Sequence, residues 1–344
     1  MSAATSTTIA AIRNGQARRR LGLRAFLVSL LAVMFALSLM FGQSYVPAGD
    51  VVRVLMGEPV AGVGFTVGTL RLPRAVLSLL AGLSFGLAGV AFQLMLRNPL
   101  ASPDIIGISS GASAAAVFSI VVLALSGPIV SLMAVLAGLA VALLIYLLSI
   151  RNGQAGTRLI LIGIGISAMV QSFIAYLLLH APEWSRQEAI RWLTGSVNGA
   201  RLDQALPLLA ALILFGTLLL SRTRDLEALR MGDDMAAAIG TRVSATRIVV
   251  MISAVGMIAV ATAVTGPIAF VSFLAGPVAA RIAGSNGSLL VPSALVGAIL
   301  VLAGDFCGQY LLPSRLPVGV VTGALGAPYL LYLIIRTNRT GRSL

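Results

Sequence analysis

Long stretches without a charged side chain recur along the chain, and they constrain its fold more than any other feature. Residues 75–96 and 105–150 contain no Asp, Glu, Lys or Arg. Runs of 18 or more uncharged apolar residues are typical of segments that cross a lipid bilayer. Within the bilayer, such segments must satisfy their own backbone donors and acceptors, which makes them helices. The sequence therefore predicts an all-α polytopic membrane protein.

Gly, Pro and Ser residues divide the apolar sequence into about ten predicted spans. The piece at 269–283 is short for a full crossing, so we expect a partial or broken helix there. We assign residues 1–23 to an N-terminal tail, 24–336 to a transmembrane permease domain and 337–344 to a C-terminal tail. The predicted spans cover residues 24–42, 75–96, 105–125, 128–150, 158–180, 204–221, 245–265, 269–283, 289–311 and 317–336.

The arginines predict the orientation of these spans. Ten spans place both termini on one side, and most of the 24 basic residues then fall on that side. Because arginine collects in cytoplasmic loops, we expect both termini in the cytoplasm. The arginines on the outer side are Arg53, Arg71, Arg74, Arg186, Arg191, Arg201 and Arg315.

Several classes of function are excluded by composition. The chain has no lysine, so it lacks the phosphate-binding Lys of a P-loop ATPase and the amine of Schiff-base chemistry. A single histidine, His180, and a single cysteine, Cys307, argue against a metal or haem site within one chain. The net charge of +13 lies in short loops, so it indicates membrane orientation rather than nucleic-acid binding. We expect no cofactor, no metal and no nucleic acid.

A short polar stretch, "RNPLASPDIIGISSGA" (97–112), separates two apolar runs. Asn98-Pro99 and the following Ser-Pro pair favour turns, and Asp104 is suited to cap a helix. Gly107 and Gly111 then follow at the spacing that lets membrane helices approach closely. Gly86 and its glycine neighbours repeat this pattern in the preceding span. The pattern predicts a crowded bundle core for both spans.

The longest cytoplasmic loop, residues 221–243, is amphipathic. Residues 233–239 favour a helix that Gly240 closes as a C-cap. One or two short helices at the membrane surface are expected. They are either interfacial helices without a partner or a docking surface for a soluble cytoplasmic protein.

Three outer charges carry alternative interpretations. Arg71 and Arg74, just before the second predicted span, are suited to meet acidic groups of an external partner or to reach lipid headgroups. Asp305 is an intramembrane carboxylate, as a proton-coupled transporter would need. The alternative is a structural Asp305 that bonds nearby backbone or Gln309.

Six landmarks in order resemble the permease subunits of bacterial iron–siderophore ABC importers, the family that also contains the cobalamin importer permease. The resemblance spans residues 44–336. The landmarks are "LRLPR" (70–74), "GLAGVAFQLMLRNPLASPDIIGISSGA" (86–112), "RWLTGS" (191–196), "MGDDMAAAIG" (231–240), "GPIAFVSFLAGPVAARIAG" (266–284) and "LPVGVVTGALGAPYLLYLI" (316–334).

The resemblance implies a ten-helix inner-membrane subunit that translocates a ferric siderophore and is not itself an enzyme. It would pair with a second permease subunit, identical or different, around a central pathway. Cytoplasmic ATP-binding subunits would hydrolyse ATP below, and a periplasmic substrate-binding protein would dock above. Alternatives are cobalamin or haem as cargo within the same family, or a proton-coupled secondary transporter.

The resemblance also assigns roles to residues. Arg71 and Arg74 would dock the binding protein. The ATPase coupling loop would contain Leu229, Met231, Gly232, Asp233, Ala237 and Gly240. The cytoplasmic end of the pathway and its packing would depend on Gly86, Gln93, Asn98, Pro99, Gly107 and Gly111.

Three positions depart from the family pattern. Many relatives have Pro-His or Pro-Gln at Gly276-Pro277, Arg at Gln309 and Glu at Arg315. The last two changes lie near the expected docking surface. They indicate the subgroup that pairs with a different permease chain, as in catecholate-type siderophore importers.

Overall fold

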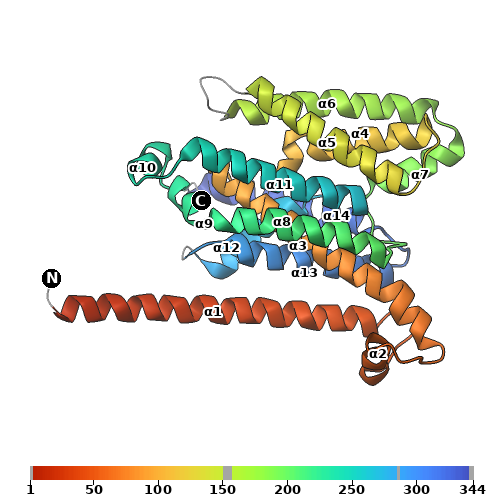
Figure 1. The fold of residues 1–344 in the computed structure, drawn as a ribbon, viewed down its shortest axis with the longest axis horizontal. Helices are drawn as coiled ribbons and strands as arrows, with labels where there is room; N and C mark the ends of the chain where they lie inside the picture. The colour runs from red at the N-terminus through yellow and green to blue at the C-terminus, as the bar shows by residue number, and fades with distance from the viewer. Residues whose placement is uncertain (1–2, 150–156, 285–286, 341–344) are drawn as a thin grey trace.

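The computed structural model of the protein describes residues 3–149, 157–284 and 287–340, and its regular elements in these ranges are all helical (Figure 1). Seven helices in the described chain are long and apolar enough to cross a membrane, and three shorter apolar helices add to them. Each corresponds to one predicted span. The expectation of an all-α membrane protein with about ten transmembrane helices is confirmed.

The crossing elements are listed here with their bounds. They are α1 (Ala3–Met40), η1 with α3 (Phe65–Arg71 and Leu72–Leu96), α4 (Ile108–Val121), α5 (Pro128–Ser149), α6 (Thr157–His180), η3 with α8 (Leu202–Gln204 and Ala205–Ser221), α11 (Val243–Thr265), α12 (Val271–Ala283), α13 with η4 (Leu290–Phe306 and Cys307–Leu311) and α14 (Val318–Thr340). The short connecting helices are α2 (Ala48–Leu55), η2 (Pro103–Ile106), α7 (Glu183–Leu193), α9 (Thr223–Leu229) and α10 (Asp233–Ala238).

Some boundaries differ from the predicted ones. The second crossing begins at Phe65 with a π-helical turn, ten residues before the expected start, so Arg71 and Arg74 lie within the helix rather than before it. The third is shorter than the predicted 105–125, because a 3₁₀ turn and the left-handed Gly107 precede α4. Hydropathy marks where a helix is apolar, whereas its ends depend on turns and caps.

Helix α3 runs through the middle of the bundle, between α8 and α11 on one side and α12 and α13 on the other (Figure 1). In its most apolar window 83% of the residues are buried, against 17% for α1 and α6. Glycines let its neighbours approach. A Cβ on Gly82 would lie 2.5 Å from the Ala298 Cα of α13, and one on Gly86 would overlap the Ser293 carbonyl. The glycine spacing thus places a buried helix at the centre, with α1, α5, α6 and α8 facing outward.

The two ends of the bundle carry different structures. Helices α9 and α10 lie at one end, where α1 also begins, while α2 and α7 lie at the opposite end (Figure 1). Helix α3 runs from the α2 end to the α9 end. We call these the outer end (α2, α7) and the inner end (α9, α10).

Candidate functional site

The α9–α10 segment (residues 223–240) forms two short helices at the inner end, as the amphipathic loop predicts. Gly232, between the helices, has φ +105°, and Gly240, after α10, has φ +92°. Only glycine adopts such angles at no steric cost. The two glycines thus set the angle at which α10 is presented.

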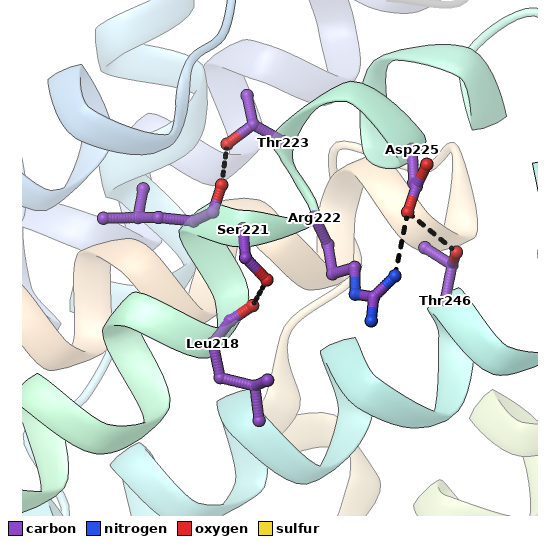
Figure 2. A network of polar contacts seen from close by, with 7 residues as sticks. Leu218, Ser221, Arg222, Thr223, Asp225 and Thr246 are labelled. Atoms are coloured by element: carbon purple, nitrogen blue, oxygen red, sulfur yellow. Dashed lines mark hydrogen bonds and ion pairs between the residues drawn. The ribbon is translucent and has the colours of Figure 1, made fainter.

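Polar contacts hold this segment on the bundle (Figure 2). The Ser221 and Thr223 hydroxyls donate at 2.6 Å to carbonyls in the last turn of α8 and so complete the end of that helix. The Asp225 carboxylate then accepts from Arg222 at 3.5 Å and from Thr246 of α11 at 3.4 Å. These contacts fix where α9 leaves α8 and where it rests on α11.

Asp233, the first residue of α10, is the main polar contact of the segment. The Arg247 guanidinium of α11 donates to its two carboxylate oxygens at 3.0 and 2.8 Å. The Arg97 guanidinium lies 3.7 Å from the same carboxylate. Arg97 is the left-handed residue that ends α3, with φ +51°. One carboxylate therefore joins α10 to both α11 and the central helix.

The segment buries one apolar face and exposes another. Leu226, Leu229 and Ala236 are fully buried against the bundle, which explains the apolar positions of the pattern. On the opposite face Met231, Met235 and Ile239 are 60%, 54% and 58% exposed. Ala237 and Gly240 are also exposed. Flexible, polarizable methionines suit a surface that adapts to a partner.

The polar stretch after α3 is a folded turn rather than a site for chemistry. The Asn98 side chain accepts a hydrogen bond from the Leu100 backbone N–H at 2.9 Å. This contact and the following Pro99 are typical of a turn. Ser102, not Asp104, caps the following turn. The Asp104 carboxylate instead accepts from Ser109 at 2.6 Å and from Ser272 of α12 at 2.5 Å. Asp104 therefore ties α4 to α12.

The remaining sequence-selected residues sit in close helix contacts. A Cβ on Gly111 would lie 2.7 Å from Val141 of α5, and Gly107 has φ +77°. The Gln93 side chain is buried and donates to the Phe273 carbonyl at 3.0 Å, filling the space beside Gly276. These residues therefore contribute to the close packing of α3 and α4 against their neighbouring helices.

At the outer end, both arginines of "LRLPR" have partners inside the chain. Arg71 is 6% exposed and donates to the carbonyls of Leu39 and Met40 at 2.9 Å, which closes the end of α1. The Arg74 guanidinium makes a bidentate contact with Asp305 of α13, with both distances 2.5 Å. The structural alternative for Asp305 predicts a bond to nearby backbone or Gln309, and its partner in the structure is instead Arg74.

Three polar contacts were not predicted from the sequence. They are Arg247 with Asp233, Ser272 with Asp104, and Arg74 with Asp305. Arg247 follows the loop and carries a charge in the first turn of a predicted span, a signal that marks it as paired or interfacial. A lone serine such as Ser272 gives no comparable signal. No group of three His, Cys, Asp or Glu side chains that could hold a metal occurs among the described residues.

Known proteins with similar sequences are membrane transport proteins, in agreement with this fold. A model of the FecCD transport family matches residues 30–336. The ferric enterobactin transport system permease protein FepG of Escherichia coli K12 is 39% identical over 326 residues, covering 94% of this chain and 98% of the relative. FepD, a permease protein named for the same system, is 32% identical and covers 92% of this chain and 95% of its own length.

A solved metal-chelate type ABC transporter in an inward-facing conformation has the same fold. It superposes with a TM-score of 0.79 at 26% identity, covering 91% of this chain and 98% of the solved chain. The family match covers most of the present sequence and includes the central helix, the α9–α10 segment and the outer arginines. This chain belongs to the FecCD transport family.

Proposed function

We propose that this chain is the transmembrane permease subunit of an ATP-driven importer that carries a ferric siderophore across the bacterial inner membrane. The observation that carries the proposal is the near full-length similarity to FepG, together with an α9–α10 segment that exposes an apolar face at one end of the bundle. The chain is a transport subunit of an ABC transporter, and it has relatives named for ferric siderophore transport.

The α9–α10 segment is the proposed coupling element. Met231, Met235 and Ile239 would lie against a cytoplasmic ATP-binding subunit, and movement of that subunit would displace α10. Asp233 would pass the displacement to α11 through Arg247 and to α3 through Arg97. Because these helices are packed tightly, a shift at the inner end moves whole helices rather than single side chains.

The orientation and the second permease chain are also proposals. The distribution of arginines supports a cytoplasmic location for the inner end and for both termini. FepG and FepD carry the name of one transport system and both resemble this chain, more so FepG. This supports pairing with a different permease chain rather than with a second copy, as do Gln309 and Arg315.

A substrate-binding protein would dock at the outer end, and the Arg74–Asp305 pair supplies a sharp test of the role predicted for Arg74. If Arg74 recognises an acidic group of the binding protein, Asp305 competes for the same guanidinium. Asp305→Asn removes the competing carboxylate and should tighten docking severalfold, measured as the Kd between the purified permease complex and the binding protein, with chemical unfolding showing that the variant is folded. Adding Arg74→Gln should abolish the gain. Weaker or unchanged docking in Asp305→Asn would assign Arg74 to structure alone.

Uptake tests the cargo. In cells that lack this chain, we expect uptake of radiolabelled ferric siderophore to be lost and uptake of cobalamin to persist, with recovery on complementation. Loss of cobalamin or haem uptake instead would keep the fold and change the cargo. Ferric siderophore uptake that persists without the ATP-binding subunit would favour the proton-coupled alternative.

A further inference from the structure

A cavity of about 250 Å³ lies at the inner end, between the early turns of α1 and the connection from α12 to α13. It belongs to none of the contacts described above. The residues that line it are Gln16, Arg19, Arg20, Leu23, Arg24, Ile282, Ala283, Ser288 and Pro292.

The charge of this cavity is of one sign. Arg19, Arg20 and Arg24 line it, and no carboxylate does. Within the described ranges none of the three forms an ion pair, and the hydrogen bond of the Arg20 side chain is to the Gln16 amide oxygen, at 3.5 Å. Other exposed arginines of the described chain without an ion pair, such as Arg224 and Arg242, do not line this cavity, so its distinguishing feature is that three cations share it. Three guanidinium groups thus converge without a counter-charge.

Part of the cavity lining is apolar and comes from Leu23, Ile282, Ala283 and Pro292. Leu23 begins the stripe that continues at Leu27, which is 2% exposed and packs with residues of α12 and α13. Just beyond, α1 exposes Phe26 and Val28 by more than half. Arg24 lies two residues before Phe26, so the cations adjoin an exposed apolar face of α1.

A glycine next to the cavity leaves space for the Arg20 side chain. Gly287, in the α12–α13 connection, has φ +92°, and a Cβ there would lie 3.0 Å from the Arg20 guanidinium. A side chain at this position would crowd the cation. Gly287 thus leaves room for the Arg20 guanidinium beside the cavity.

We propose that this cavity binds the headgroup of an anionic phospholipid, with the lipid phosphate on Arg19, Arg20 and Arg24 and an acyl chain along the exposed face of α1. Basic pockets between membrane helices at the cytoplasmic side suit such headgroups. Guanidinium groups match phosphate in charge and in bidentate geometry. The bound lipid would hold the weakly packed α1 against the α12–α13 connection.

The test is lipid binding by the full chain, purified in detergent and followed by native mass spectrometry and thermal unfolding. Dioleoylphosphatidylglycerol should remain bound and raise the unfolding temperature, whereas dioleoylphosphatidylcholine should not. Changing the three arginines to glutamine should weaken phosphatidylglycerol binding about a hundredfold, at about one kcal/mol for each cation. Ala283→Leu, which fills the cavity and keeps every charge, should also weaken it.

Arg18→Gln is the matched control, because Arg18 lies on the same helix outside the cavity. It should reduce binding much less than Arg20→Gln. Unfolding temperatures without lipid show whether each variant folds. The proposal is overturned if the triple variant keeps the lipid, if phosphatidylcholine binds equally, or if inorganic phosphate stabilises the chain as much as the lipid. None of these readouts depends on transport or on the partner subunits.

Discussion

The two ends of α3 carry the same kind of contact with opposite character. At the outer end Arg74 and Asp305 meet at 2.5 Å through two parallel hydrogen bonds, with side chains only 14% and 11% exposed. At the inner end Arg97 and Asp233 lie 3.7 Å apart, with side chains 47% and 24% exposed. The outer contact is a fixed joint between two helices. The inner one is a loose contact that Asp233 shares with Arg247.

The difference shows where the central helix is held and where it can respond. A desolvated bidentate pair is costly to open, because each charge would be left without a partner. An exposed pair exchanges with water at little cost. A push on α10 would therefore change contacts at the inner end of α3 while its outer end stays fixed to α13. We therefore expect the central helix to be held more firmly at its outer end than at its inner end.

The largest effect is expected from breaking the outer pair on one side only. Asp305→Ala leaves the Arg74 guanidinium buried without a partner, and should lower the free energy of unfolding by about 3–5 kcal/mol. Chemical unfolding of the purified chain in detergent measures this. Replacing both residues by leucine removes both charges and should recover most of the loss. If the single and double variants were equally unstable, the buried charge would not be the cause.

A second prediction concerns the close contact of α3 with α13, which lies past the middle of α3 toward its inner end. Gly86→Val places carbon atoms where the Ser293 carbonyl and the Gly297 Cα now lie, and should destabilise the chain by about 1–3 kcal/mol. Gly165→Ala in α6 is the matched control, since nothing lies within 4 Å of its added Cβ. That change should be neutral or stabilise by about 0.5–1 kcal/mol. Equal losses in both variants would show that the contact of Gly86 with α13 is not the cause.

The sequence predicted the parts of this comparison that depend on local pattern. Uncharged runs located the spans, glycine spacing predicted the crowded surface of α3, and the turn residues Asn98 and Pro99 marked its inner end. The two short helices of the α9–α10 segment followed from the amphipathic pattern and Gly240. Each of these signals lies within one or two helical turns.

The contacts that define the two ends are not local. Arg74 and Asp305 are 231 residues apart, and Asp104 and Ser272 are 168 apart. From a single sequence one can predict that a charged residue within a span needs a partner. The helix that supplies the partner cannot be predicted, because its identity depends on how the helices pack. The early start of the second crossing was also missed, because it too depends on packing. A π-helical turn before Leu72 extends the helix back to Phe65, ahead of the uncharged run, and Arg71 in this turn is buried.

The smallest effect on stability, and the sharpest test of the comparison, is expected at the inner end. Arg97→Gln removes an exposed contact that contributes at most about 1 kcal/mol, so the unfolding free energy should hardly change. Uptake should fall nonetheless while ATP hydrolysis by the assembled importer continues, because α10 would move without carrying α3 with it. Arg53→Gln, a charge change of the same kind at an exposed outer-end pair, serves as the control. Full uptake in Arg97→Gln would leave Arg247 and α11 as the route by which α10 acts on the bundle, and would reduce the inner end of α3 to packing alone.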